Sequence, residues 1–455
     1  MKKFLFIYLL LPFALTAQQK FNFADSAIEN RLKKDLYFLS SDSAKGREAG
    51  TIYEMKAGNY IANEFKKAGL TPFNINDSSY FQEFSNYNNF WDEENNTLKI
   101  NETALELWKD FYPLAHAGEG TVNGLAFNKA SSKNPESDLK GKILFINEEN
   151  TVIEEEAKNA ESKGASAIII IPKSEFYSYY NSQINCLCPV FIINKSTYEK
   201  INFSENTIVS LQLKKQSGQK MHNVIGCINN RATSTIIIGG HYDHLGFKKD
   251  NESGELKIFN GADDNASGTI AVIELARYLK QEGSKNYNYI FCAFSGEEEG
   301  LLGSYHFVNS EYFKSIPFSQ VKYMLDYDMV GRLGAFGNVL FLNGTGSSKQ
   351  WKKIIKNNRP ENFYINKIPD GMNGSDDYPF YQKGIPVLFF ITGLHHEYHT
   401  PADDPEKVNI KGEVHIINYS KNLINNISSE TKINYHKVNF WQTFRSYYIY
   451  AKMLL

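Results

Sequence analysis

The sequence predicts an α/β fold in which a mixed, mostly parallel sheet is covered by helices on both faces, with a small second domain inserted into it. Three observations support this prediction. Apolar runs at 234–238, 287–295, 321–325 and 385–391 are typical of buried strands. The stretches between these runs have a helical pattern, which favours parallel pairing of the strands. A separate strand, helix, strand series within 96–212 indicates an inserted domain with its own sheet.

Length, composition and charge together indicate a globular protein with a large core. The chain has 455 residues, 42% of them hydrophobic, which is enough to bury a large core. Its formal net charge is -2, and the two signs are interspersed along the chain. We therefore expect a soluble globular protein without a nucleic-acid partner and without a polybasic membrane patch.

The first residues have the pattern of a cleaved signal peptide, 1–17. Two lysines follow Met1, an apolar run covers 4–14, and small residues lead to Ala17. The run is shorter than the ~20 residues that span a bilayer, so we expect no integral membrane segment after cleavage. The sequence thus predicts a secreted or periplasmic protein. Of its four cysteines, Cys292 lies in an apolar strand and is expected in the core, while the pairing of Cys186 and Cys188 stays open.

The chain then divides into four further parts. Residues 18–95 form the first part of the main domain, with a helical pattern in 25–75 that stops at Gly69 before Pro72. The inserted domain, 96–212, has strands at 142–146, 167–172 and 189–194 and a helix at 152–163, but no clustered Asp or Glu with ligand-like spacing. The core of the main domain follows at 213–430, and an aromatic tail at 431–455 is either a packed helix or an interaction segment.

The most informative stretch is 236–268. Three isoleucines predict a buried strand that ends at two glycines, and His241 and Asp243 follow directly. In extended chain, residues i and i+2 point the same way, so Asp243 is placed to accept the spare ring N–H of a metal-bound His241. Asp263 and Asp264 come just ahead of a helix that stops at Gly283, and a carboxylate there is placed to bridge two metal ions.

Candidate ligands follow all four predicted strands of the core. In α/β sheets, ligands bind at the carboxyl ends of strands. Histidine nitrogens and carboxylate oxygens suit Zn²⁺, and one shared carboxylate leaves each ion open positions for water and substrate. Adjacent side chains at a strand end diverge, so one of Glu297 and Glu298 can bind metal while the other acts as a base. The strand-end candidates are His241, Glu297, Glu298, Asp328 and His399.

These motifs resemble the M28 family of zinc aminopeptidases. They are His241-x-Asp243, the run Gly-Ala-Asp-Asp-Asn-Ala-Ser-Gly at 261–268, Glu297-Glu298, Asp328-Met-Val-Gly and Tyr398-His399-Thr-Pro. The resemblance implies a zinc-peptidase/phosphorylase-like fold and two Zn²⁺ ions per chain. It implies that His241 and Asp328 hold one zinc, that Glu298 and His399 hold the other, and that Asp264 bridges them. It also implies that Glu297 is the general base and that Tyr398 stabilises the oxyanion.

The inserted segment resembles a protease-associated (PA) domain. The resemblance rests on Leu139-Lys-Gly-Lys-Ile, Lys163-Gly-Ala-Ser-Ala and Pro189-Val-Phe-Ile. The chain departs from the M28 pattern at Asp377, where the family often has histidine, and this affects the expected wall of the substrate pocket. The tail from 431 has no counterpart in the resemblance.

The resulting hypothesis is an exported di-zinc aminopeptidase that removes N-terminal residues from peptides with a free N-terminus, with Glu297 as the base toward a zinc-bound water. Asp243 on His241 and Asp403 on His399 are expected to fix the ring tautomers. Two alternatives stay open. One is a single-zinc enzyme similar to glutaminyl-peptide cyclotransferases, and the other is a receptor-like binding protein without activity.

Overall fold

The computed structural model describes residues 20–453, apart from 74–77, 87–94, 108, 115–116, 129–138, 148–152, 174–185, 202–203, 205, 215–218, 250–254, 336, 372–373 and 428–430. The predicted signal peptide lies outside these residues. The chain separates into two compact units, Met1–Phe84 with Met221–Leu455, and Ser85–Lys220. Among the described helices, none has the length and apolar character needed to cross a bilayer.

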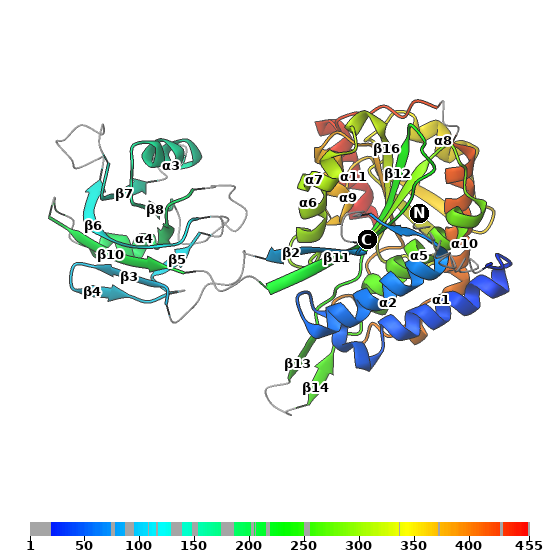
Figure 1. Ribbon diagram of the computed structural model, residues 1–455, viewed down its shortest axis with the longest axis horizontal. Coiled ribbons are helices and arrows are strands. Elements are labelled where there is room, and N and C mark those ends of the chain that lie inside the picture. The colour runs from blue at the N-terminus through cyan, green and yellow to red at the C-terminus, as the bar shows by residue number, and fades with distance from the viewer. Residues whose placement is uncertain are drawn as a thin grey trace, which may run out of the picture. The chain divides into compact units, whose positions relative to one another are not determined.

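The first unit is built on a nine-stranded mixed sheet, which together with its covering helices confirms the predicted α/β class (Figure 1). Its centre consists of four neighbouring parallel strands that correspond to the four apolar runs: β15 (Asn288–Phe294), β12 (Thr235–His241), β16 (Val321–Tyr327) and β19 (Val387–Ile391). The remaining strands extend the two edges and are β1 (Thr71–Pro72), β2 (Phe81–Asn86), β11 (Gln219–Ile228), β17 (Val339–Asn343) and β18 (Tyr364–Lys367).

Alternation along β12 explains why both faces of the sheet are covered. Ile236 and Ile238 belong to one apolar cluster, whereas Ile237, which points to the opposite face, belongs to another. The first cluster includes side chains from α1 (Asp25–Leu39), α2 (Ile52–Ala68), α5 (Gly268–Glu282) and α10 (Ile410–Asn426). The second includes side chains from α6 (Leu302–Asn309), α7 (Glu311–Lys314) and α9 (Asp377–Gln382).

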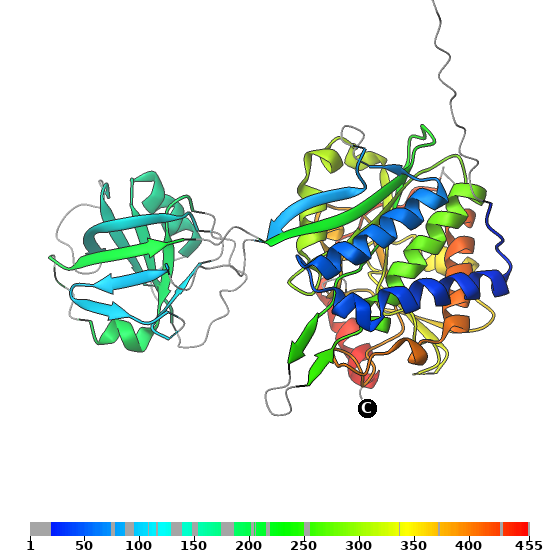
Figure 2. The same ribbon diagram turned by 60° about the horizontal axis from the view of Figure 1, so that its bottom comes forward.

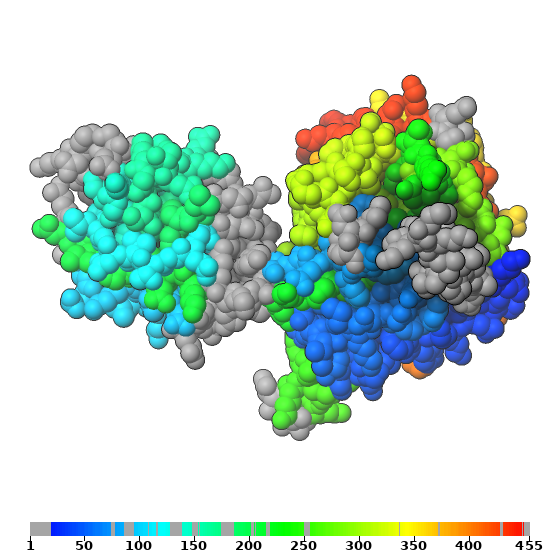
Figure 3. All heavy atoms as spheres, viewed as in Figure 1, coloured from blue at the N-terminus to red at the C-terminus, as the bar shows by residue number. Residues whose placement is uncertain are grey.

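The helical pattern at 25–75 forms two helices with a short helical turn, η1 (Asp42–Arg47), between them. The Thr51 hydroxyl accepts hydrogen bonds from the backbone of Tyr53 and Glu54 and thereby caps the start of α2. Gly69 ends α2 in the left-handed conformation, with φ of 82°. These N-terminal helices (blue) and α6 with α7 (yellow-green) form much of one surface of the first unit (Figures 2 and 3).

The second unit has its own eight-stranded sheet, in the order β4-β3-β10-β6-β7-β8-β9-β5. The predicted segment 96–212 lies inside this unit, whose bounds are wider because the chain enters and leaves it through β2 and β11. Three predicted strands and the predicted helix correspond to β7 (Lys142–Asn147), β8 (Ala167–Ile171), β9 (Val190–Ile193) and α3 (Ile153–Ser162). The other elements are β3 (Thr97–Ile100), β4 (Thr103–Leu105), β5 (Phe111–Pro113), β6 (Gly120–Asn128), β10 (Ile208–Leu213) and α4 (Lys195–Glu199).

The structure also describes the cysteines and the aromatic tail. Cys292 lies fully buried in β15, as expected, and Cys186 and Cys188 are free thiols in this structure. The aromatic tail forms a terminal helix, α11 (Phe440–Met453).

Candidate metal centre

Two neighbouring strands place the first pair of predicted ligands. His241 is the last residue of β12, and Asp328 follows directly after β16. Because β12 and β16 are parallel neighbours, these side chains meet at the same edge of the sheet. His241 Nε2 lies 3.4 Å from Asp328 Oδ1 and 3.4 Å from Asp264 Oδ1. The three residues are buried and form one group able to hold a metal ion.

Asp264 lies in the short helical segment η4 (Ala262–Ser267), which leads into α5. This segment approaches β16 closely, because Asn265 Nδ2 donates to the carbonyl of Tyr327 at 2.9 Å. A Cβ atom on Gly268 would lie 2.0 Å from the same carbonyl, so glycine is required there. The contact holds the Asp264 carboxylate beside the ends of β12 and β16.

A second group of ligands lies on the other side of Asp264. His399 Nε2 is 3.1 Å from Asp264 Oδ2 and 3.0 Å from Glu298 Oε2. Since Asp264 Oδ1 faces His241 and Asp264 Oδ2 faces His399, the two oxygens of one carboxylate serve two different groups. The structure thus brings the five predicted ligands together around Asp264, which is the arrangement that two ions sharing a carboxylate require.

His244 is a further member of the second group that sequence reasoning missed. Its Nδ1 lies 2.6 Å from Glu298 Oε1 and 3.7 Å from Asp264 Oδ2, and its side chain is fully buried. Together His244, Asp264, Glu298 and His399 are able to surround one ion. The sequence pattern that could have identified His244 is its position three residues after His241, in the segment that follows the same strand.

Glu297 and Glu298 diverge, but they do so in a turn after β15 rather than at the strand end itself. The Glu297 carbonyl accepts hydrogen bonds from the backbone N–H groups of Gly300 and Leu301, which fixes the turn. Glu297 Oε2 lies 3.8 Å from His241 Nε2, whereas Glu298 faces His244 and His399. Glu297 therefore stands beside the first group and belongs to neither group of ligands.

Asp243 connects the strand end to this turn. One of its carboxylate oxygens, Oδ1, lies 3.7 Å from His241 Nδ1 and accepts the backbone N–H of Glu297 at 3.3 Å. The closer partner of His241 Nδ1 is the backbone carbonyl of Asp243, at 3.3 Å. Asp243 thus lies where it was predicted beside His241, and it also positions the base candidate.

The electrostatic surroundings of the two glutamates differ. Burial raises the pKa of the Glu297 carboxyl, and the nearby carboxylates of Asp328 and Asp376 raise it further, although His241 lowers it. Burial also raises the pKa of Glu298, but hydrogen bonds from His244 and His399 outweigh it and hold that pKa below its usual value. Neighbouring carboxyls with opposite shifts are typical of sites that assign them different tasks.

The donor atoms of the first group fit a metal ion. His241 Nε2 and Asp328 Oδ1 are buried, and neither has a hydrogen-bond partner among the described residues. Buried polar atoms without a partner are costly. A cation at the point where imidazole nitrogen and carboxylate oxygens converge removes that cost, and this donor set suits zinc.

Tyr398 and His399 lie at the more accessible side of the site. The Tyr398 ring stacks on the His399 ring with centroids 3.8 Å apart, and the His399 side chain is 36% exposed. Burial raises the pKa of the Tyr398 hydroxyl, and the nearby acidic residues raise it further. Tyr398 therefore remains a hydrogen-bond donor at neutral pH.

Arg47 is a second residue that sequence reasoning missed, because no local pattern marks it. It is completely buried, and its guanidinium donates to the backbone carbonyls of Leu39, Tyr242, Asn260 and Gly261 at 2.7 to 2.9 Å. These bonds tie the segment after β12 to the segment before Asp264. Arg47 thus holds both sides of the centre at a fixed separation.

The predicted contact between Asp403 and His399 is wrong. Asp403 Oδ2 instead accepts the backbone N–H groups of Asp263 and Asp264 at 2.9 and 3.0 Å. Its other oxygen, Oδ1, lies 3.5 Å from Arg332 and 3.8 Å from His395. Two adjacent N–H donors in a turn are a strong anchor for a carboxylate, so Asp403 positions the backbone of Asp264 rather than the histidine ring.

Comparison with known proteins shows which families the two units are similar to. Residues 223–424 match the model of peptidase family M28, and residues 111–220 match the PA domain model. Aminopeptidase YwaD of Bacillus subtilis is 30% identical over 285 residues, which are 60% of this chain and 59% of that protein. Leucine aminopeptidase 1 of Uncinocarpus reesii is 29% identical over 217 residues, 44% of this chain and 52% of that protein. The match thus spans less than two thirds of either relative.

Solved structures agree on the fold. A zinc aminopeptidase from Bacillus subtilis, BSAP, superposes with a TM-score of 0.51 at 23% identity, covering 92% of this chain and 99% of the other. An aminopeptidase from Aneurinibacillus sp. strain AM-1 gives a TM-score of 0.50 at 21% identity over 92% and 99% of the two chains. With the motifs in their expected order around the site, residues 223–424 are similar to peptidase family M28, and a segment similar to a PA domain precedes them at 111–220.

Proposed function

We propose that this protein is an exported di-zinc aminopeptidase that releases N-terminal residues from peptides. The observation that carries the proposal is Asp264, whose two carboxylate oxygens face two separate groups of ligands. One group is His241 and Asp328, and the other is Glu298, His399 and the adjacent His244. When bound there, zinc ions supply Lewis acidity toward a water molecule and the scissile carbonyl.

The remaining steps fall to residues of the chain. Glu297, held by its turn beside His241 and outside both ligand groups, is positioned to take a proton from the attacking water on a carboxylate oxygen. The same carboxyl then returns the proton to the nitrogen of the departing amine. The Tyr398 hydroxyl is the donor offered to the developing oxyanion, since its raised pKa keeps it protonated.

Support for action at the N-terminus comes from the relatives. The proteins from Bacillus subtilis and Uncinocarpus reesii both bear the name aminopeptidase, and the solved structure from Bacillus subtilis is that of a zinc aminopeptidase. We extend this activity and this metal to the present chain because its donor set is complete. Export rests on the sequence of residues 1–17 alone.

The test compares free and blocked substrates. Purified protein is assayed with a panel of aminoacyl p-nitroanilides and their N-acetyl counterparts, with and without 1,10-phenanthroline. We expect hydrolysis of the free amines only, loss of activity with the chelator, and recovery after addition of zinc. Cleavage of N-acetylated substrates at a similar rate, or activity that resists the chelator, contradicts the proposal.

A further inference from the structure

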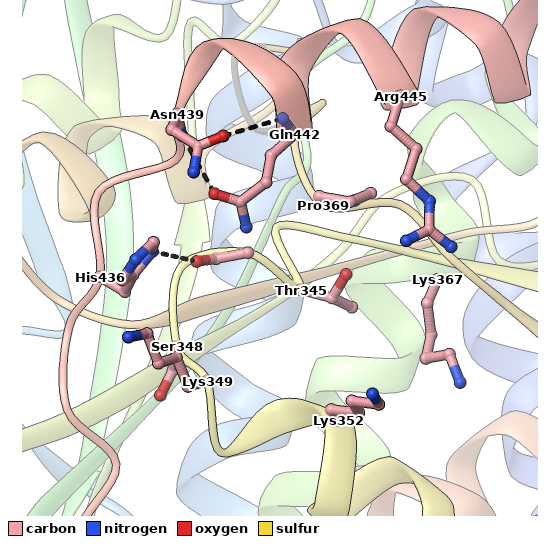
Figure 4. A pocket seen from close by; sticks show the side chains of 11 residues that line it. Thr345, Ser348, Lys349, Lys352, Lys367, Pro369, His436, Asn439, Gln442 and Arg445 are labelled. Atoms are coloured by element: carbon pink, nitrogen blue, oxygen red, sulfur yellow. Dashed lines mark hydrogen bonds between the residues drawn. The ribbon is translucent and has the colours of Figure 1, made fainter.

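A cavity of about 660 Å³ lies where the C-terminal segment packs against the first unit, and none of the candidate metal ligands lines it (Figure 4). Three segments form its walls. They are 345–352, which leads from β17 into α8 (Trp351–Asn357), 367–369 at the end of β18, and 436–445 at the start of α11. A volume of this size is in the range of small-molecule binding sites.

The charge of this cavity is strongly unbalanced. Three lysines and one arginine line it together with His436, and no acidic residue is among the lining residues that the structure describes. The chain as a whole has 49 basic and 51 acidic residues, so the excess of positive charge is local. The cationic side chains are Lys349, Lys352, Lys367 and Arg445, and none of them forms an ion pair with a described residue.

The fold holds these cations near one another. The backbone N–H of His436 donates to the Ser347 carbonyl at 2.7 Å, and the Thr443 hydroxyl donates to the Asp370 carboxylate at 2.5 Å. These contacts fix the start of α11, so Arg445 points to the same side of the cavity as Lys367 (Figure 4). Like charges gathered by a docked segment repel one another, and an anionic ligand relieves that repulsion.

The cavity also offers neutral polar groups and close packing. The Gln442 carbonyl oxygen, Oε1, accepts the backbone N–H of Asn439, so its amide Nε2 is the group that remains beside Gly346. A Cβ atom at Gly346 would lie 2.8 Å from that Nε2 and 2.7 Å from the Pro369 carbonyl. Glycine at this position therefore lets the C-terminal segment approach and present the Gln442 amide.

We propose that this cavity binds a ligand that carries several phosphate-type negative charges. A single carboxylate leaves most of the four positive charges unbalanced, whereas two phosphate groups match them. The planar guanidinium of Arg445 suits two phosphate oxygens at once, and lysine ammonium groups are common phosphate partners. The phosphates belong either to a soluble organic bisphosphate or to a phospholipid headgroup that carries two phosphates, and the chemistry of recognition is the same.

A phospholipid is tested as a source of the phosphates because α11, the helix that carries Arg445, also exposes large aromatic side chains. Phe440 and Trp441 are 73% and 75% exposed. Exposed aromatic residues next to basic ones are typical of helices that lie at a membrane surface.

The experiment measures binding of fructose 1,6-bisphosphate to the zinc-loaded full chain by calorimetry at low ionic strength. The test variant is Lys352→Gln with Arg445→Gln. The control is Lys353→Gln with Lys437→Gln, which removes the same charge at exposed positions that do not line the cavity. We expect the test variant to lose roughly two- to fivefold in affinity for each cation removed, since these side chains are exposed, and the control to keep nearly the wild-type affinity.

A parallel arm measures cosedimentation with vesicles that contain cardiolipin, whose headgroup carries two phosphates, and with vesicles of phosphatidylcholine. Binding to the cardiolipin vesicles alone, weakened in the test variant, supports a lipid phosphate, and binding of the bisphosphate, weakened in the same way, supports a soluble one. The proposal is overturned if the wild type binds neither, or if test and control variants lose binding equally or keep it equally. Thermal unfolding checks the fold of each variant, and Lys352→Gln alone replaces the double variant if that protein is unfolded.

Discussion

The two halves of the metal centre are built in different ways. His241 and Asp328 stand at the ends of adjacent parallel strands, so the sheet itself sets their separation. Glu298, His244 and His399 lie in connecting segments, and hydrogen bonds between distant parts of the chain set their positions. The first half is buried, whereas the His399 side chain is 36% exposed. The second half therefore reaches the accessible side of the centre at His399, whereas the side chains of His244 and Glu298 in the same half are 0% and 8% exposed.

Asp264 joins the halves, so its replacement is expected to have the largest effect. Asp264→Asn keeps the shape of the side chain but removes the charge that both groups share. We expect zinc to be weakened at both positions and hydrolysis to become undetectable. Zinc bound after equilibrium dialysis is the measurement, and a variant that keeps one ion at wild-type affinity would show that the halves are independent.

Glu297→Gln tests the residue that stands beside the first half without belonging to it. The amide keeps the shape and loses the base, so both ions should remain while the rate falls by ~10² or more. Rate and zinc content are measured on the same preparation. Glu299→Gln is the matched control from the same acidic run, and it should keep both the rate and the zinc.

Glu298→Gln is expected to separate the halves. A neutral amide replaces an anionic ligand in the second half, so one ion should be lost while the His241 half keeps its ion. Excess zinc should restore part of the activity, which it cannot do for Glu297→Gln. If Glu297→Gln loses zinc and Glu298→Gln retains both ions, the two roles are reversed.

Substitution of His244 should give the smallest effect and distinguish two roles. If His244 only orients Glu298, His244→Asn should preserve most of the zinc affinity. The reason is that the Asn side-chain amide keeps an N–H donor near the position of Nδ1. His244→Ala removes the donor and should weaken one ion by roughly 10- to 100-fold, as is typical for groups that hold a metal ligand. Equal losses in both variants would assign His244 as a direct ligand. Titration with zinc followed by calorimetry provides the affinities.

The same contrast explains what could be predicted from the sequence. His241 and Asp328 follow buried strands, and a strand end is visible in hydrophobic periodicity. The α/β fold and the inserted unit were predictable for the same reason. Glu298 and His399 were candidates on the same ground, because they follow the predicted strands at 287–295 and 385–391, but periodicity did not place them beside His244.

The remaining features depend on contacts that a local pattern does not encode. Arg47 is separated by 195 residues from Tyr242, whose carbonyl it binds, and Asp403 by 139 residues from the Asp264 N–H that it anchors. The prediction for Asp403 failed because its carboxylate accepts the backbone N–H groups of Asp263 and Asp264 instead of a ring N–H of His399. The basic cavity could not be predicted from the sequence either, because its cations come from three segments that meet only after folding.

The most direct test of the account is the zinc stoichiometry of the full chain at saturation. Purified protein is stripped with a chelator, dialysed against a series of zinc concentrations, and analysed for metal and protein together. Two zinc ions per chain, with the second lost in Glu298→Gln, is the result that a shared Asp264 carboxylate predicts. Saturation at one zinc per chain, unchanged by Glu298→Gln, would contradict it.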